Sequence, residues 1–231
     1  MNPQTGEIYA MAVSPSFDLN AFNTQTNPLI YANPLVQNVY EMGSIIKPLT
    51  MAAGIDSGAV TETTTYNDTG SIEIDGKKIS NFDGKARGVI PMQEVLSQSL
   101  NVGASYVATS MGSTTMRNYF LDHYKLGTTT GIDMPGEVHG IVKNLQSRRL
   151  VEYGTASYEQ GIALTPIETV RALATLANGG YLVVPHLVRG ITYTNGVTKD
   201  LSWGEKQQVL KPETATVVSR MLTQVVDTAL A

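Results

Sequence analysis

The chain has 231 residues, of which 42% are hydrophobic and 16% are charged, and its formal net charge at pH 7 is -4. Such a chain can bury a core as one large domain or two small ones, and it has neither the composition of a disordered protein nor the basic footprint of a nucleic-acid-binding one. It contains no cysteine, which excludes disulfides and thiolate chemistry. Its three histidines lie far apart without a metal-binding spacing, so we expect no metal site, and nothing indicates a cofactor.

The N-terminal part of the chain predicts a turn at residues 2–6 and then a buried strand at residues 7–13, where apolar residues occupy both faces. We expect the hairpin partner of this strand to lie outside the sequence. Residues 14–40, rich in proline and asparagine, predict an ordered loop that crosses a face of the molecule. No signal peptide is visible and no apolar run reaches the ~18 residues of a membrane span, so we expect any targeting or anchoring segment outside this chain.

The stretch Glu41-Met42-Gly43-Ser44-Ile45-Ile46-Lys47-Pro48 predicts the start of a helix that continues to about Gly58. Residues three apart share a helix face, so the hydroxyl of Ser44 and the amine of Lys47 can point into the same space. A serine needs a base to become a nucleophile, and a lysine kept neutral by burial and by the helix N-terminus can be that base. The pattern alone is weak, because a serine at a helix start is often only a cap.

The middle of the chain predicts a hairpin over residues 71–80, with Asp75-Gly76 as its turn, and then a short helix that Pro91 opens. Ser99-Leu100-Asn101 lies between two helical patterns, at residues 91–98 and 102–111. Ser99 or Asn101 can cap the second helix, or the two side chains can face Ser44. These interpretations are compatible, because a capping loop is a rigid support for both groups.

The rest of the chain predicts helices that begin near residues 113, 165 and 212, separated by loops and short strands. Residues 127–140 predict a glycine-rich surface connection that lacks the spacing and lysine of a phosphate-binding loop. Thr165 and Glu168 predict a capping box, and Asn178-Gly179-Gly180 the end of that helix. Residues 181–203 predict two or three strands.

In this order, the segments resemble the transpeptidase domain of class B penicillin-binding proteins. The motifs that carry the resemblance are the Ser-x-x-Lys of Ser44 and Lys47, the Ser-x-Asn of Ser99 and Asn101, and similar stretches at residues 3–11, 14–20, 130–137, 160–166 and 177–180. The third motif of the superfamily, Lys-Thr-Gly, does not occur in the sequence. We expect it on a strand after the last helix, so that the chain is a fragment without its C-terminal strands and part of its first strand.

The resemblance implies an α+β fold over residues 1–231, forming one partial domain with a sheet part and a helical lobe. In the family, a five-stranded antiparallel sheet has helices on both sides, and the site lies between the sheet edge and the helical lobe. We expect this architecture here in incomplete form.

The resemblance also implies the roles of the candidate residues. Ser44 attacks the penultimate D-Ala carbonyl of a peptidoglycan stem peptide, Lys47 takes the serine proton, and Ser99 passes it to the leaving amine. Asn101 binds the substrate amide and helps to hold Lys47. β-Lactams acylate the same serine, and the expected partners are other proteins of cell-wall synthesis and division.

The family resemblance places the protein at the extracytoplasmic face of the bacterial cell membrane, held by an anchor that this chain does not contain. Within the family, Asp68-Thr69-Gly70 and Ile79-Ser80-Asn81 resemble division-associated members more than elongation-associated ones. We therefore expect a role in septal cell division.

Two other functions use a similar site. A serine β-lactamase needs a base that activates water against its acyl-enzyme, and Glu137 and Glu152 are the candidates in the middle of the chain. A non-catalytic penicillin sensor needs only to be stably acylated, and a scaffold with a vestigial site needs no acylation. The presence of Ser44, Lys47, Ser99 and Asn101 together argues against a decayed site.

Overall fold

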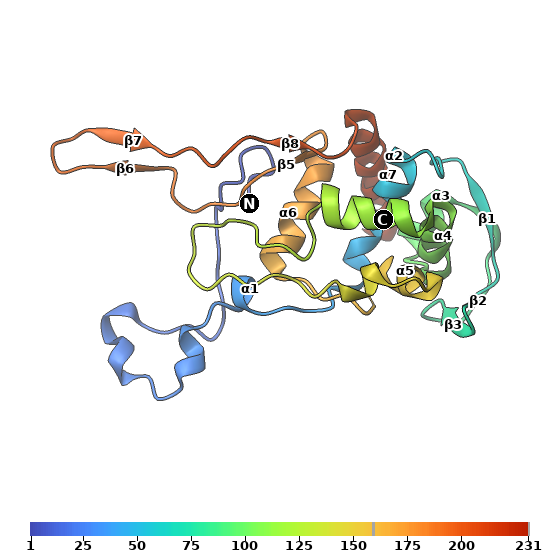
Figure 1. Cartoon of the computed structure of the whole chain (residues 1–231), viewed down its shortest axis with the longest axis horizontal. Coiled ribbons are helices and arrows are strands. Elements are labelled where there is room, and N and C mark those ends of the chain that lie inside the picture. The colour runs from blue at the N-terminus through green and yellow to red at the C-terminus, as the bar shows by residue number, and fades with distance from the viewer. Residues whose placement is uncertain (159, 231) are drawn as a thin grey trace.

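The computed structural model describes residues 1–158 and 160–230. Figure 1 shows most of the helices gathered at one end of an elongated molecule, while the β6–β7 hairpin and a blue loop with the turns Leu19–Thr24 and Pro28–Tyr31 project at the other end. The helices are α1 (Pro34–Gln37), α2 (Lys47–Asp56), α3 (Met92–Ser97), α4 (Asn101–Arg117), α5 (Leu150–Ala156), α6 (Pro166–Ala177) and α7 (Pro212–Leu230). Short 3-10 turns lie at Leu19–Thr24, Pro28–Tyr31, Gly43–Ile46 and Lys143–Gln146, and a π-helical turn at Asn118–His123.

The helix α2 forms the centre of the helical end and packs against α4, α6 and α7. Its residues are buried on nearly every side, and small side chains bring its neighbours close. A Cβ atom added at Gly54 would meet the side chain of Val107 on α4 at 2.4 Å. Because both helices are fixed by this close contact, the residues at their N-termini keep a defined separation.

The strands form antiparallel pairs, as the expected α+β class requires. They are β1 (Thr65–Asp68) with β4 (Gly88–Pro91), β2 (Ser71–Ile74) with β3 (Lys77–Ser80), β5 (Tyr181–Leu182) with β8 (Gln207–Gln208), and β6 (Gly190–Thr192) with β7 (Thr198–Asp200). Within the described residues these are four separate two-stranded sheets and not the five-stranded sheet of the family, which we expected here only in incomplete form. Each pair therefore has two outer edges whose backbone N–H and C=O groups are not paired with a further strand of the described residues.

The prediction of a buried strand at residues 7–13 was wrong. Glu7 makes one isolated bridge to His186, and Ile8 N donates to His186 O at 2.8 Å, but no ladder continues from there. Tyr9 is 72% exposed. The apolar run was present, but among the described residues no neighbouring strand runs alongside to pair with it, and a strand is stable only in a ladder.

The local predictions elsewhere were largely confirmed. The hairpin β2–β3 turns at Asp75 and Gly76, and α6 begins with the capping box of Thr165 and Glu168. The last helix, α7, begins at Pro212 as expected. These signals are local, since a turn or a cap is decided by residues within a few positions of one another. Among the helices of the described residues, none combines the length and the apolar character that crossing a bilayer requires.

Candidate active site

Ser44 lies in the 3-10 turn Gly43–Ile46, directly before α2. Gly43 has a φ of +70°, a left-handed conformation that side chains rarely adopt, although a Cβ there would meet nothing within 4 Å. Glycine is therefore favoured at position 43 by its backbone conformation, and not because a side chain would clash with neighbouring atoms. The turn that it permits leaves the Ser44 side chain exposed while the next turn, with Lys47, is buried.

Lys47 is the most constrained charged group of the site. The residue is 2% exposed, and its Nζ donates to Ser44 Oγ at 3.0 Å, to Ser99 Oγ at 2.9 Å and to Ser99 O at 2.6 Å. Burial lowers the pKa of Lys47 from 10.5 to about 8, because the charged form loses its hydration. An amine with this pKa is partly neutral near physiological pH and can accept the proton of a neighbouring hydroxyl.

Ser99 occupies the loop between α3 and α4 with a φ of +53°. This left-handed backbone is unfavourable for a residue with a Cβ. It places both the carbonyl and the hydroxyl of Ser99 on Lys47, so that two of the three lysine hydrogen bonds come from one residue. Non-glycine residues in such a conformation often belong to functional sites.

Asn101 is the first residue of α4 and lines the same cavity. Its Nδ2 donates to Ser80 O at 3.0 Å, and it makes no hydrogen bond to Lys47. The expectation that Asn101 helps to hold Lys47 was therefore wrong, because the three protons of the ammonium already have acceptors. Neither Ser99 nor Asn101 is the N-cap residue of α4, because that position is occupied by Leu100, whose side chain makes no capping hydrogen bond.

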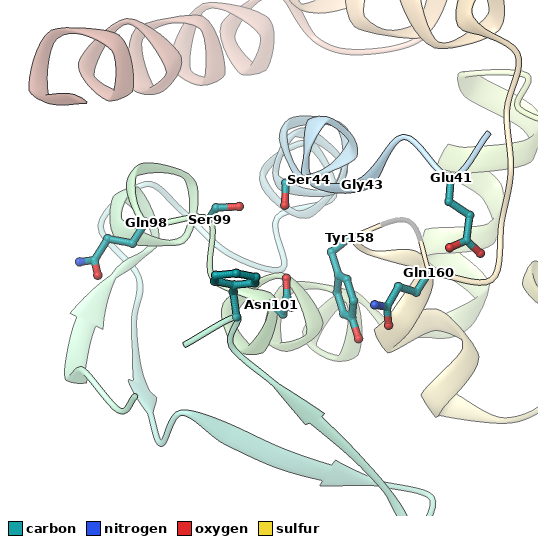
Figure 2. A pocket seen from close by; sticks show the side chains of 9 residues that line it. Glu41, Gly43, Ser44, Gln98, Ser99, Asn101, Tyr158 and Gln160 are labelled. Carbon is teal, nitrogen blue, oxygen red and sulfur yellow. The ribbon is translucent and has the colours of Figure 1, made fainter. Parts of the chain in front are cut away.

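A cavity of about 430 Å³ brings these groups together. Figure 2 shows Ser44, Ser99 and Asn101 around it, Ser44 from the turn before α2 and the other two from the segment that begins α4, with Tyr158 beside Asn101. The described residues that line it are Glu41, Gly43, Ser44, Phe82, Gln98, Ser99, Asn101, Tyr158 and Gln160. Lys47 lies behind the two serines. The site is thus an open pocket of mixed polar and apolar lining, with the hydroxyls of Ser44 and Ser99 at its wall and the amine of Lys47 hydrogen-bonded to both.

Sequence reasoning gave no site role to several lining residues, among them Phe82, Tyr158 and Gln160. Phe82 stands fully exposed in the turn after β3, and Tyr158 and Gln160 follow α5. An aromatic residue in the Asn81–Gly84 turn was a weak signal, because turns usually expose polar residues. The other two are brought in from more than 50 positions away in sequence by the packing of α5 on α4.

The carboxylates proposed as a β-lactamase base lie elsewhere. Glu137 accepts hydrogen bonds from Thr130 N and Thr130 Oγ1, both at 2.6 Å, and from Gly131 N at 3.1 Å. Glu152 lies on α5 within 4.0 Å of Arg149. Neither is among the described residues that line the cavity. Among those residues the carboxylate is Glu41, which accepts from Gly161 N at 3.0 Å.

The residues that the structure describes contain no cluster of three or more histidines or carboxylates that could hold a metal ion.

The chain matches the penicillin-binding protein transpeptidase domain family over residues 1–230. It therefore belongs to this family, as its motifs suggested. It is 32% identical over 230 residues to Stage V sporulation protein D of Bacillus subtilis, covering 98% of this chain and 35% of that protein. It is 30% identical over 176 residues to peptidoglycan D,D-transpeptidase FtsI of Escherichia coli, covering 76% of this chain and 29% of that protein.

Solved structures show the same fold. The apo form of penicillin-binding protein 3 from Mycobacterium tuberculosis superposes with a TM-score of 0.84 at 25% identity, covering 98% of this chain and 50% of that chain. The chain spans only about a third of the length of the two relatives above, 35% and 29%. Their names describe whole proteins, of which this chain corresponds to one part.

Proposed function

We propose that this chain forms the penicillin-binding part of a peptidoglycan D,D-transpeptidase, which crosslinks stem peptides in the bacterial cell wall. The observation that carries the proposal is the position of Lys47 Nζ, 3.0 Å from Ser44 Oγ and 2.9 Å from Ser99 Oγ, with a pKa lowered to about 8 by burial. Family membership and the names of the relatives support the substrate class.

The proposed reaction begins at Ser44. Neutral Lys47 accepts the proton of the hydroxyl as Ser44 Oγ attacks the carbonyl of the penultimate D-Ala, and an acyl-serine ester forms. The proton passes from Lys47 through Ser99 to the departing amine, and the terminal D-Ala leaves. An acceptor amine from a second stem peptide then attacks the ester, which releases Ser44 with its proton and completes the crosslink.

Asn101 is proposed to bind the substrate amide. Its side chain lines the cavity and uses Nδ2 on Ser80 O, which leaves its Oδ1 as an acceptor toward the pocket. The backbone N–H of Ser44 is the proposed first donor to the oxyanion. The second donor in the family lies on the strand after Lys-Thr-Gly, a motif that does not occur in these 231 residues. Loss of one such donor typically costs about a hundredfold to a thousandfold in rate.

We further propose a location at the extracytoplasmic face of the cell membrane and partners among the proteins of cell-wall synthesis and division. Names of relatives, which include peptidoglycan D,D-transpeptidase FtsI and Stage V sporulation protein D, support this assignment. Binding assays against the division and elongation complexes would distinguish the two roles.

The test is mass spectrometry after incubation with benzylpenicillin, followed by peptide mapping. We expect one stable adduct on Ser44, its loss in Ser44→Ala, and its retention in a control, Ser202→Ala, at an exposed serine far along the chain. The experiment is run on this chain and on the complete gene product. Labelling of only the longer protein would show that the site needs the additional strands. Absence of an adduct from both proteins would contradict the proposal.

A further inference from the structure

A buried carboxylate that does not line the cavity stands outside the groups that the proposed reaction uses. Asp68, the last residue of β1, is 0% exposed. Both of its carboxylate oxygens accept from Asn81 Nδ2 at 3.0 Å, and Asp68 Oδ1 also accepts from Gly70 N at 3.3 Å. Among the described residues no lysine or arginine forms an ion pair with it. A buried carboxylate is costly unless hydrogen bonds replace its lost hydration, so these contacts must be well defined.

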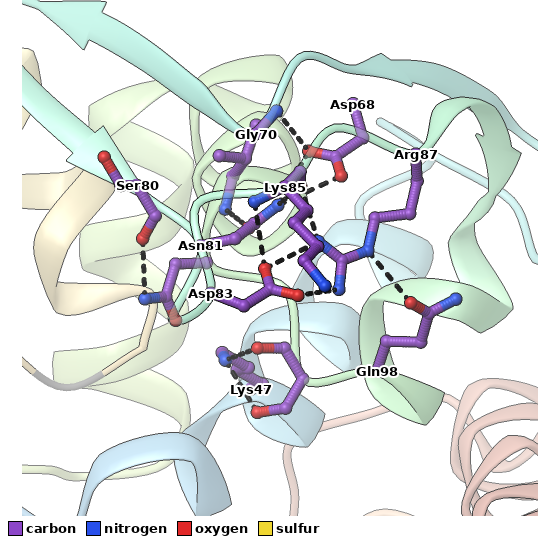
Figure 3. A network of polar contacts seen from close by, with 12 residues as sticks. Lys47, Asp68, Gly70, Ser80, Asn81, Asp83, Lys85, Arg87 and Gln98 are labelled. Atoms are coloured by element: carbon purple, nitrogen blue, oxygen red, sulfur yellow. Dashed lines mark hydrogen bonds and ion pairs between the residues drawn. The ribbon is translucent and has the colours of Figure 1, made fainter.

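Asn81 joins this carboxylate to the active-site helix. It is 4% exposed, and its Oδ1 accepts the backbone N–H of Val102 at 3.1 Å. The first N–H groups of a helix have no partner within the helix, and α4 has no cap of its own. Asn81 therefore caps α4 from a different part of the chain. Figure 3 shows Asn81 in the polar network that it shares with Asp68 and Gly70.

The charge of Asp68 fixes which way the Asn81 amide points. A carboxylate only accepts, so it selects the NH₂ group of Asn81 and turns the amide oxygen toward Val102 N. The neighbouring residue acts on the same segment, because Ser80 O accepts from Asn101 Nδ2 at 3.0 Å. Two consecutive residues thus hold the start of α4, and with it Ser99 and Asn101.

The backbone around Asp68 is packed too tightly for many substitutions. Gly70 has a φ of +76°, and a Cβ there would lie 2.7 Å from Gly84 O and 2.8 Å from Ala86 N. Asn81 N donates to Gly70 O at 2.9 Å, and Arg87 N donates to Asp68 O at 3.1 Å. The Asp68–Gly70 and Asn81–Arg87 segments are therefore one rigid unit. It contains Asp68-Thr69-Gly70 and Asn81, which belong to the two segments that resemble division-associated members.

We infer that Asp68 and Asn81 are positioning residues, which hold the Ser99-Leu100-Asn101 segment at the distance from Ser44 and Lys47 that acylation requires. The inference rests on the proposed function, because its main readout is acylation of Ser44. The variants that isolate it are Asn81→Asp, Asp68→Asn and the double exchange. Asn81→Asp sets two carboxylates against each other, whereas the double variant restores one amide and one carboxylate, with the carboxylate at position 81 now accepting from the helix N-terminus.

The experiment measures the second-order rate of acylation by a fluorescent penicillin in the complete gene product. A displacement of about 1 Å at a site can cost on the order of a hundredfold, so we expect Asn81→Asp to slow acylation by about that factor. Asp68→Asn should be intermediate, because its amide no longer selects one orientation of Asn81. The double variant should recover most of the rate.

The matched control is Tyr119→Phe, which removes a buried hydrogen bond of 2.7 Å to Asp56, away from the cavity. It should lower thermal stability without slowing acylation. A purely structural role of the Asp68–Asn81 pair predicts instead that acylation follows stability in all variants. Wild-type rates in Asn81→Asp, or a double variant no faster than both single variants, would overturn the inference.

A second measurement separates the two proposals. Amide hydrogen exchange over residues 99–104 should be faster in Asn81→Asp, normal in the double variant and normal in Tyr119→Phe. If the wild-type protein is not acylated at all, the proposed function fails, and this exchange pattern alone decides whether the pair positions the segment. Unchanged exchange in Asn81→Asp would then refute it. If Asn81→Asp does not fold, recovery of folding and acylation in the double variant supports the pairing.

Discussion

Lys47 Nζ donates to the hydroxyls of Ser44 and Ser99 from a position where its residue is 2% exposed. One amine therefore lies between the proposed nucleophile and the proposed proton relay, in surroundings that disfavour its charge. Burial lowers its pKa to about 8. This arrangement makes the protonation state of Lys47 the property on which the proposed reaction depends most directly.

Replacement of Lys47 by arginine should abolish the base while keeping a cation. Arginine is not deprotonated in proteins, so it cannot accept the Ser44 proton. Because general base catalysis typically contributes about a hundredfold to ten-thousandfold, acylation by a fluorescent penicillin should slow by that range. Lys77→Arg, at an exposed position on β3, is the matched control and should acylate normally. A rapid reaction in Lys47→Arg would exclude Lys47 as the base.

Acylation should also depend on pH in a defined direction. Lys47 acts as a base only when neutral, and the neutral fraction grows as the pH rises toward its pKa of about 8. The rate should increase roughly tenfold per pH unit below that value and level off above it. Burial raises the pKa of Tyr158 beside the cavity, so that phenol stays protonated in this range. The measurement is the acylation rate constant across neutral and mildly alkaline pH, and a flat profile would contradict the assignment.

Sequence reasoning located the groups that local spacing brings together. The three-residue interval from Ser44 to Lys47 placed them on one side of a helix start, and the capping box of Thr165 was evident from four residues. It failed where partners are distant in sequence. Asn81 caps α4 across 21 positions, which no local pattern indicates, and residues 7–13 had the apolar run of a buried strand but find no neighbouring strand within the described residues.

The same limit applies to the contact predicted between Asn101 and Lys47. The motifs placed Asn101 and Lys47 near the same site, but the sequence does not show how many hydrogen-bond acceptors surround the Lys47 amine. Ser99 supplies two acceptors because its backbone adopts a φ of +53°, and that conformation is not evident from a serine in the sequence. A residue type with a low preference for its backbone conformation is predictable only after the surrounding packing is known.

The backbone of Ser99 allows its conformation and its hydroxyl to be tested separately. Ser99→Ala and Ser99→Gly both remove the hydroxyl, but only glycine adopts positive φ without strain. The glycine variant should be more stable than the alanine variant by about 1 kcal/mol in urea unfolding. Both should acylate more slowly, by on the order of a hundredfold, if the hydroxyl passes the proton. Normal acylation in either variant would show that the hydroxyl is dispensable.

The fate of the acyl-enzyme distinguishes a transpeptidase from a β-lactamase. Glu137 is engaged by Thr130 and Gly131, and Glu152 lies on α5, so neither candidate base faces the cavity. Glu41 does line it but accepts from Gly161 N at 3.0 Å. We therefore expect nitrocefin hydrolysis to stop after about one equivalent, as for an enzyme whose acyl intermediate accumulates.

The measurement is the time course of nitrocefin hydrolysis in the complete gene product, with Glu41→Gln as the informative variant and Glu152→Gln as its control. Both variants should keep a stable adduct, because neither carboxylate activates water against the ester. Continuous turnover by the wild-type protein that Glu41→Gln abolishes would make Glu41 the deacylating base. The same site would then hydrolyse β-lactams, and the β-lactamase alternative would replace the transpeptidase assignment.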